Sequence, residues 1–135
     1  MILQRQNYLS LMLGCLLMLS PWVYGEQNED NAARYQRAEA LYEQESFKQA
    51  REILVDIAKK GYAPAQNRLG IIYRNGIGVS TNYKAAVRWF HQAASQNYAP
   101  AQKNLGQMYE QGLGVDRDLG KAYRLYRAAE SQSAE

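Results

Sequence analysis

The stretch LGIIYRNGIGV, residues Leu69 to Val79, returns 36 positions later as LGQMYEQGLGV, residues Leu105 to Val115. Each copy joins an apolar helical pattern to a loop that contains two glycines. Identity at the same offset continues outside these stretches, because the pentapeptide YAPAQ occupies residues 62–66 and again residues 98–102. Self-similarity at a fixed period of this length is typical of a repeat architecture.

Each repeat has the local chemistry of a helical hairpin. Ala65, Leu69 and Tyr73 follow the spacing of one apolar helical face, and the later repeat carries the same residue types at the same spacing. Pro64 and Pro100 precede these patterns, where a fixed φ and a missing N–H suit the first helical turn. The pattern predicts that the first helix of each hairpin begins close to its proline.

The ends of the helices are marked by residues one period apart. Ser46, Asn82 and Asp118 stand just before the expected second helices and are predicted N-caps, each worth about 1 kcal/mol. Gly61 and Asn97 are the two residue types that best end a helix in the left-handed conformation. We therefore expect short, sharply bounded helices.

The glycines of the repeat have two different expected roles. Gly76 and Gly78 lie in the loop, where positive φ or close backbone approach is required. Gly70 and Gly106 lie inside helices, where glycine costs roughly 1 kcal/mol relative to alanine. Their repetition at that position predicts that a neighbouring helix passes too close for a side chain.

The pattern A-x3-L-G-x2-Y-x2-G-x-G-V, followed by an N-capped helix rich in alanine, resembles the Sel-1-like repeat family, a relative of the tetratricopeptide repeats. The resemblance implies an all-α, right-handed solenoid of three αα-hairpins with six helices. Residues 62–97 and 98–131 are similar to Sel-1-like repeats, residues 33–61 resemble a tetratricopeptide repeat, and residues 132–135 form a tail. Leu125 in place of the tryptophan seen at Trp89, and Gly120 inside the last helix, depart from the pattern and indicate a terminal capping helix.

The first 25 residues have the order of a secretory signal peptide. An apolar run from Tyr8 to Leu19 follows Arg5, and Pro21 precedes a small residue at Gly25, after which we expect cleavage. Residues 26–32 then form a short polar linker. The run is too short for a bilayer-spanning helix, which needs roughly 20 residues. An alternative interpretation is a lipoprotein signal with lipidation of Cys15. Both interpretations predict an exported protein, either periplasmic or secreted, or anchored by lipid.

The family resemblance implies a scaffold that holds a protein or peptide on its concave side. Residues opposite the packed face of the two first helices give a stripe of amides and cations with one apolar side chain, which suits a polar peptide with one apolar anchor. An ordinary solvated helix face is the alternative. The predicted partner-binding residues are Asn67, Arg68, Ile71 and Arg74, with Lys103, Gln107 and Glu110 one period on.

Charge is distributed unevenly along the chain. Overall, 16 Lys and Arg stand against 13 Asp and Glu, a balance too mild for a nucleic-acid-binding protein. From Ile57 to Tyr109, however, there are seven Lys or Arg and no Asp or Glu, whereas Glu26 to Asp56 is acidic. Such a gradient favours an acidic partner.

The sequence offers little for catalysis. His91 is the only histidine, and the central acid-free segment excludes paired carboxylates there. One histidine without a cysteine in the processed chain cannot supply a transition-metal site, so we expect no enzyme, metal or cofactor. The hypothesis is a non-enzymatic envelope scaffold or adaptor. The alternative is a periplasmic immunity protein that blocks a secreted antibacterial enzyme, because proteins with this resemblance include both.

Overall fold

The computed structural model describes residues 30–132, and within them it contains six α-helices and no strand. The predicted signal peptide, its cleavage site and Cys15 lie outside the described residues. The first helix begins at Asn31, inside the predicted linker of residues 26–32. The helices are α2 (Asn31–Glu43), α3 (Phe47–Lys59), α4 (Ala63–Asn75), α5 (Tyr83–Ala94), α6 (Ala99–Gln111) and α7 (Leu119–Ser131).

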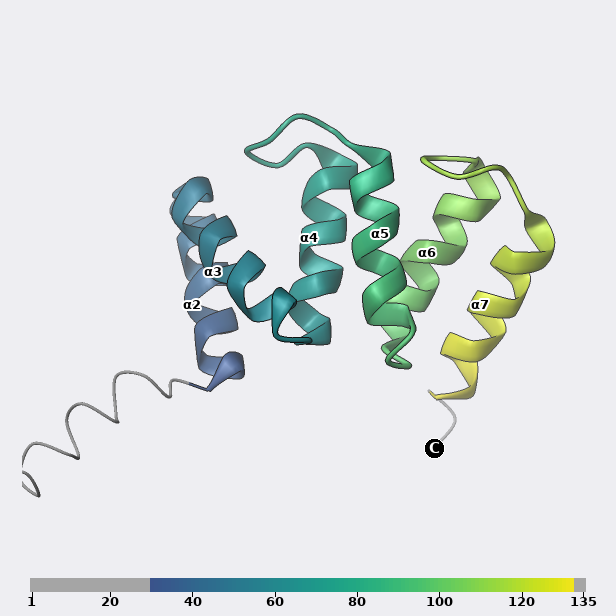
Figure 1. Cartoon of the computed structure of the whole chain (residues 1–135), viewed down its shortest axis with the longest axis horizontal. Coiled ribbons are helices and arrows are strands. Elements are labelled where there is room, and N and C mark those ends of the chain that lie inside the picture. The colour runs from purple at the N-terminus through teal and green to yellow at the C-terminus, as the bar shows by residue number, and fades with distance from the viewer. Residues whose placement is uncertain (1–29, 133–135) are drawn as a thin grey trace, which may run out of the picture. The chain divides into compact units, whose positions relative to one another are not determined.

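Consecutive helices pack against one another in chain order (Figure 1). Three hairpins are formed by α2 with α3, α4 with α5, and α6 with α7. In addition, α3 contacts α4 and α5 contacts α6, so that each hairpin is joined to the next. The prediction of an all-α stack of three helical hairpins is confirmed. No helix between residues 30 and 132 has the length and apolar character that a membrane crossing requires.

The apolar core continues from one hairpin to the next. One cluster, which includes the fully buried Leu54 and Leu69, is built from α2, α3 and α4. A second cluster, which includes Phe90 and Met108, is built from α5 and α6. Tyr73 packs against both clusters. Because full burial of a large apolar side chain is worth roughly 1.5–3 kcal/mol, the hairpins stabilise one another through this shared core.

The loop with two glycines in each 36-residue repeat turns the chain and also contacts the preceding hairpin. Gly76 ends α4 in the left-handed conformation, with φ of 68°, and Gly78 has φ of 65°. A Cβ atom at Gly78 would lie 2.5 Å from the Cβ atom of Phe47, at the start of α3. Arg51 donates a hydrogen bond to the Gly78 carbonyl oxygen at 3.2 Å. The predicted positive φ is confirmed, and the loop also joins two hairpins.

Two of the three predicted N-caps are confirmed. The Asn82 side chain accepts a hydrogen bond from the Ala85 N–H at 3.0 Å, and Asp118 makes the equivalent bond at the start of α7. Ser46 occupies the predicted N-cap position of α3, but the expected capping hydrogen bond from its side chain is absent within residues 30–132. The preceding Glu45 is left-handed, with φ of 59°, and Ser46 has ψ of 53° in place of the extended conformation of the other caps.

The predicted left-handed helix ends are both present. Gly61 has φ of 92° and Asn97 has φ of 60°. The chain therefore turns sharply between hairpins, which places α4 beside α3 and α6 beside α5.

Candidate interaction surface

Side chains link α4 to α6 across the boundary between two hairpins. Nη1 of Arg74 donates hydrogen bonds to Oδ1 of Asn104 at 2.9 Å and to Oε1 of Gln107 at 3.2 Å. Nδ2 of Asn104 donates in turn to Oδ1 of Asn67 at 2.9 Å. We call Asn67, Arg74, Asn104 and Gln107 the polar bridge. It shows that the first helices of adjacent hairpins meet on one side of the stack.

The same side of the stack carries a contact between α2 and α4. Nε of Arg68 lies 2.8 Å from Oε1 of Glu39, and the two side chains are 25% and 29% exposed. Both atoms are buried and neither makes a hydrogen bond within residues 30–132, so the contact is an ion pair without hydrogen-bond geometry. The Arg68 guanidinium carbon also lies 5.2 Å from the centre of the Tyr42 ring. Arg68 therefore takes part in packing between two hairpins.

All four of the predicted partner-binding residues on α4 are buried or half-buried. Asn67 is only 8% exposed and belongs to the polar bridge. Ile71 is half-buried and packs against the cluster of α5 and α6, so it is not a free apolar anchor. The apolar spacing of α4 predicts that the side opposite its main apolar face is exposed. In the structure, α6 covers part of that side.

The predicted residues on α6 are exposed but face different neighbours. Gln107 turns toward α4 as part of the polar bridge. Oε2 of Glu110 accepts a hydrogen bond from the hydroxyl of Tyr126 on α7 at 2.7 Å. Burial and this hydrogen bond raise the pKa of Tyr126 to about 12. Lys103 is exposed and forms no ion pair with residues 30–132. The predicted stripe is thus divided between packing contacts and free groups.

A pocket of about 340 Å³ lies at one end of the polar bridge. Its residues come from the ends of α4 and α6, the start of α5 and the loop that follows α6. Two of them, Arg74 and Gln107, were predicted from the sequence. Of the others, Asn75, Met108 and Gln111 lie on the same two helices, whereas Tyr83 and Leu113 are brought in by α5 and by the loop after α6. We call it the bridge pocket, and it is lined by Arg74, Asn75, Tyr83, Gln107, Met108, Gln111 and Leu113.

The bridge pocket has the chemistry of a binding site for polar groups. A guanidinium and several side-chain amides can bind peptide groups or carboxylates, and Tyr83, which is 40% exposed, offers an aromatic surface. The polar bridge fixes the Arg74 side chain before any partner arrives, which lowers the entropy cost of binding. Among residues 30–132, no group of three or more His, Cys, Asp or Glu is placed to hold a metal ion.

Two pairs of glutamines, each with one buried and one exposed member, form a second connection between helices. Nε2 of Gln96 donates to Oε1 of Gln66 at 2.8 Å, and Gln66 donates to the Ala58 carbonyl oxygen at 3.0 Å. One period later, Nε2 of Gln132 donates to Oε1 of Gln102 at 3.0 Å. Both members of each pair recur after 36 residues, and this repetition is the signal from which the pairs could have been found.

The chain matches the Sel1 repeat family over residues 63–98 and 99–133, and it belongs to this family. The matched residues contain α4 to α7. Sel1 repeat proteins are protein-interaction scaffolds and are generally not enzymes. The part of the prediction that concerns protein interaction is therefore confirmed at the level of the family.

Two solved structures are similar to the chain. A Sel1 repeat protein from Oxalobacter formigenes is 35% identical with a TM-score of 0.68, over 72% of this chain and 40% of that one. A protective antigen of uropathogenic Escherichia coli with an SLR fold is 32% identical with a TM-score of 0.70, over 76% of this chain and 23% of that one. The chain thus spans less than half the length of either protein. No curated protein matches it significantly.

Proposed function

We propose that this chain is a non-enzymatic scaffold or adaptor of the cell envelope that binds a protein or peptide at the bridge pocket. The observation that carries the proposal is the position of Arg74. Its guanidinium lines a pocket and is held by Asn104 and Gln107 of the next hairpin. A fixed arginine in a partly apolar hollow is a common anchor at protein interfaces.

The charge of this region supports a partner with acidic groups. The segment from Ile57 to Tyr109 contains no Asp or Glu, so the residues of α4 and α5 that line the pocket bring no carboxylate to oppose Arg74. Lys103 is exposed on α6, the same helix as Gln107. A partner carboxylate at Arg74 would form a charge-assisted hydrogen bond, which is stronger than a neutral one.

The envelope location rests on the sequence of residues 1–25. A short apolar run followed by Pro21 and Gly25 is typical of a cleaved export signal. Mass spectrometry of the protein purified from its native cells tests this proposal. A chain that begins at Glu26 supports cleavage, a lipidated Cys15 supports a lipid anchor, and an intact Met1 in the cytoplasm would contradict export.

Affinity capture with the full chain tests the binding site. Arg74→Glu and Gln111→Glu each place a negative charge in the bridge pocket, and Gln111 makes no side-chain hydrogen bond within residues 30–132 that the second change would break. Arg88→Glu makes the same charge change as Arg74→Glu on an exposed residue of α5 and serves as the control.

Each bridge-pocket substitution is expected to reduce capture of the partner from an envelope extract, while Arg88→Glu retains it. Equal recovery by all three variants would show that the bridge pocket is not the site. The identity of the captured protein decides between the two roles. An envelope assembly protein supports the scaffold, whereas a secreted enzyme that the chain inhibits supports an immunity protein.

A further inference from the structure

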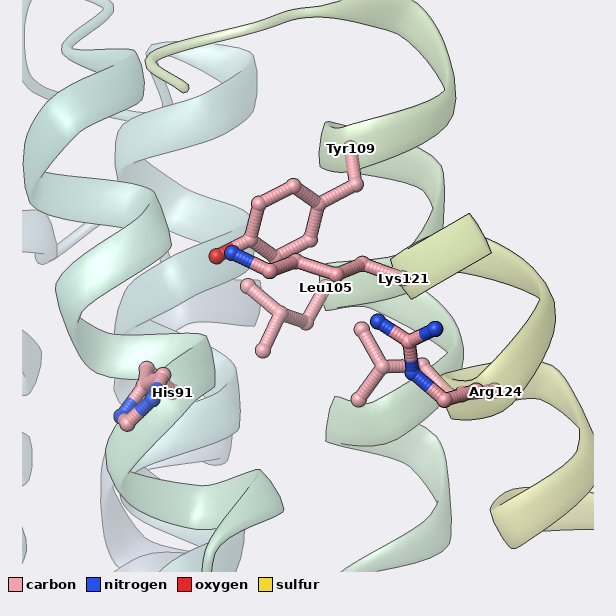
Figure 2. A pocket seen from close by; sticks show the side chains of 6 residues that line it. His91, Leu105, Tyr109, Lys121 and Arg124 are labelled. Atoms are coloured by element: carbon pink, nitrogen blue, oxygen red, sulfur yellow. The ribbon is translucent and has the colours of Figure 1, made fainter. Parts of the chain in front are cut away.

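A second pocket, of about 380 Å³, lies between α5, α6 and α7 and shares no lining residue with the bridge pocket. Figure 2 shows that its side chains come from three helices and leave a hollow between them. Its apolar groups are two leucines and a tyrosine ring, and its polar groups are the Tyr109 hydroxyl and the basic side chains of His91, Lys121 and Arg124. We call it the terminal pocket, and it is lined by His91, Leu105, Tyr109, Lys121, Arg124 and Leu125.

The repeat explains why this hollow exists. Leu125 occupies the position that Trp89 occupies 36 residues earlier. The Trp89 side chain is partly buried and packs against the core of α2, α3 and α4. Leu125 packs against the corresponding core of α5 and α6, but its side chain is much smaller than an indole. The inner hairpin therefore covers its neighbour with its own tryptophan, and the last hairpin leaves space at the equivalent place.

The substitutions around Leu125 make the terminal pocket basic. Lys121 stands one period after Ala85, which is 5% exposed, and His91 stands one period after Val55. Neither Lys121 nor Arg124 forms an ion pair with any of residues 30–132. Asp118, which precedes α7, is the N-cap of this helix, and its Oδ1 accepts a hydrogen bond from the Lys121 backbone N–H at 2.9 Å.

The two cations are placed to act on an aromatic guest and on its flanking groups. Nζ of Lys121 lies 5.1 Å from the centre of the Tyr109 ring, which is cation–π distance. A second aromatic ring in the pocket could engage the same ammonium or the Arg124 guanidinium. Carboxylates beside that ring would find unpaired cations at the rim, and such pairs combine charge with hydrogen bonding.

We infer that the terminal pocket binds a tryptophan side chain of a partner protein, presented between acidic residues. The guest replaces the indole that the repeat places at Trp89 and that the last hairpin lacks. Lys121 and Arg124 select the acidic flanks, and Leu105, Tyr109 and Leu125 contact the ring. Because the two pockets share no residue, this inference stands or falls separately from the bridge pocket.

Fluorescence anisotropy with the full chain and labelled peptides tests the inference. The first peptide carries one tryptophan between two pairs of acidic residues. In the second, alanine replaces the tryptophan, and in the third, lysines replace the acids. We expect the first peptide to bind, and each of the other two to bind about ten-fold more weakly or worse, as for the loss of an interface anchor.

Variants of the chain provide matched controls. Leu125→Trp should fill the pocket and weaken binding of the first peptide by about ten-fold. The double variant Lys121→Glu/Arg124→Glu reverses the charge at the rim of the pocket and should weaken binding of the same peptide by a similar factor. Arg88→Glu, which makes the same charge reversal as Arg124→Glu on an exposed residue of α5 that lines neither pocket, should leave the affinity unchanged. Circular dichroism confirms that each variant is folded. The exposed rim substitutions and the peptide comparison decide the question even where Leu125→Trp alters the fold.

Four results would overturn the inference. They are no binding of the first peptide, equal affinity for the alanine or the lysine peptide, full binding by the rim variant, and full binding by a folded Leu125→Trp chain. Light scattering adds a further check. A wild-type dimer that Leu125→Trp alone disrupts would show that a second copy of the chain fills the pocket, and the proposed partner would be wrong.

Discussion

Phe90 on α5 lies over Gly70 on α4 so closely that a Cβ atom at Gly70 would be 2.4 Å from ring atoms Cδ1 and Cε1. The ring is fully buried and cannot turn toward solvent. One period on, a Cβ atom at Gly106 would be 2.6 Å from Cε1 of Tyr126. The expected close approach at the helix glycines is therefore present, and an aromatic ring of the second helix makes it.

Gly70→Ala should destabilise the protein. Overpacking a core typically costs about 1–3 kcal/mol, which outweighs the roughly 1 kcal/mol that alanine gains in helix propensity. Urea unfolding followed by circular dichroism measures the change. Gly120→Ala is the control, because the atom nearest to its Cβ would be Asp118 Oδ1, at the end of a side chain, at 3.3 Å. A Gly70→Ala chain no less stable than Gly120→Ala would contradict this packing.

Gly78→Ala should cost more than Gly61→Ala. Both residues have positive φ, which costs a non-glycine residue about 1–2 kcal/mol. At Gly61 no described atom lies within 4 Å of a new Cβ, whereas at Gly78 the Phe47 side chain lies 2.5 Å away. We expect about 1–2 kcal/mol for Gly61 and about 2–4 kcal/mol for Gly78. Similar melting temperatures for the two variants would show that the contact between the loop at Gly78 and α3 does not contribute to stability.

Local chemistry made the helical hairpins predictable from the sequence. The apolar spacing around Leu69, the caps at Asn82 and Asp118, and the left-handed residues depend on neighbours within a few positions, so a single sequence displays them. The capping hydrogen bond expected from Ser46 is absent for an equally local reason. Without the glycine loop, the turn before α3 is tighter, and Glu45 adopts the left-handed conformation that changes the geometry at Ser46.

The candidate surface was less predictable because it depends on contacts between hairpins. The periodicity of α4 identifies one packed face, and the additional contact with α6 buries Asn67 on another. The ion pair of Arg68 with Glu39 joins different hairpins, and neither residue reveals its partner in the sequence. The terminal pocket depends on the absence of an indole at Leu125. The sequence shows this departure from the repeat, but the hollow that results depends on how α5, α6 and α7 pack together.

Asn82→Ala should lower the free energy of unfolding by about 1 kcal/mol, because it removes the side-chain acceptor for the Ala85 N–H. Ser46→Ala occupies the equivalent position one hairpin earlier and should change stability by less than about 0.5 kcal/mol, since Ser46 forms no capping bond within residues 30–132. Thermal unfolding of both variants measures the difference. Equal losses would mean that Ser46 caps α3 in solution.

The substitution Asp56→Asn should make the melting temperature of the protein depend less on pH in the acid range. Oδ2 of Asp56 accepts a hydrogen bond from Lys60 at 2.9 Å and lies 2.7 Å from Nη1 of Arg34. The hydrogen bonds from Lys60 and then Arg34 lower the pKa of Asp56 below its ordinary value of 3.8. Because the folded-state pKa is lowered, the carboxylate stabilises the protein above the ordinary pKa, and this contribution is lost as pH falls through the lowered pKa.

The melting temperatures of wild type and Asp56→Asn should therefore differ near neutral pH, begin to converge below the ordinary pKa, and meet below the lowered pKa. The difference in melting temperature should also narrow in about 1 M salt, because the ion pairs of Asp56 with Arg34 and Lys60 are partly exposed and salt screens them. Asp116→Asn is the matched control, since Asp116 is exposed and forms no ion pair with residues 30–132, and it should show a smaller gap at neutral pH. A gap for Asp56→Asn that widens as the pH falls would reverse the sign of the linkage and exclude stabilisation by the ionised carboxylate.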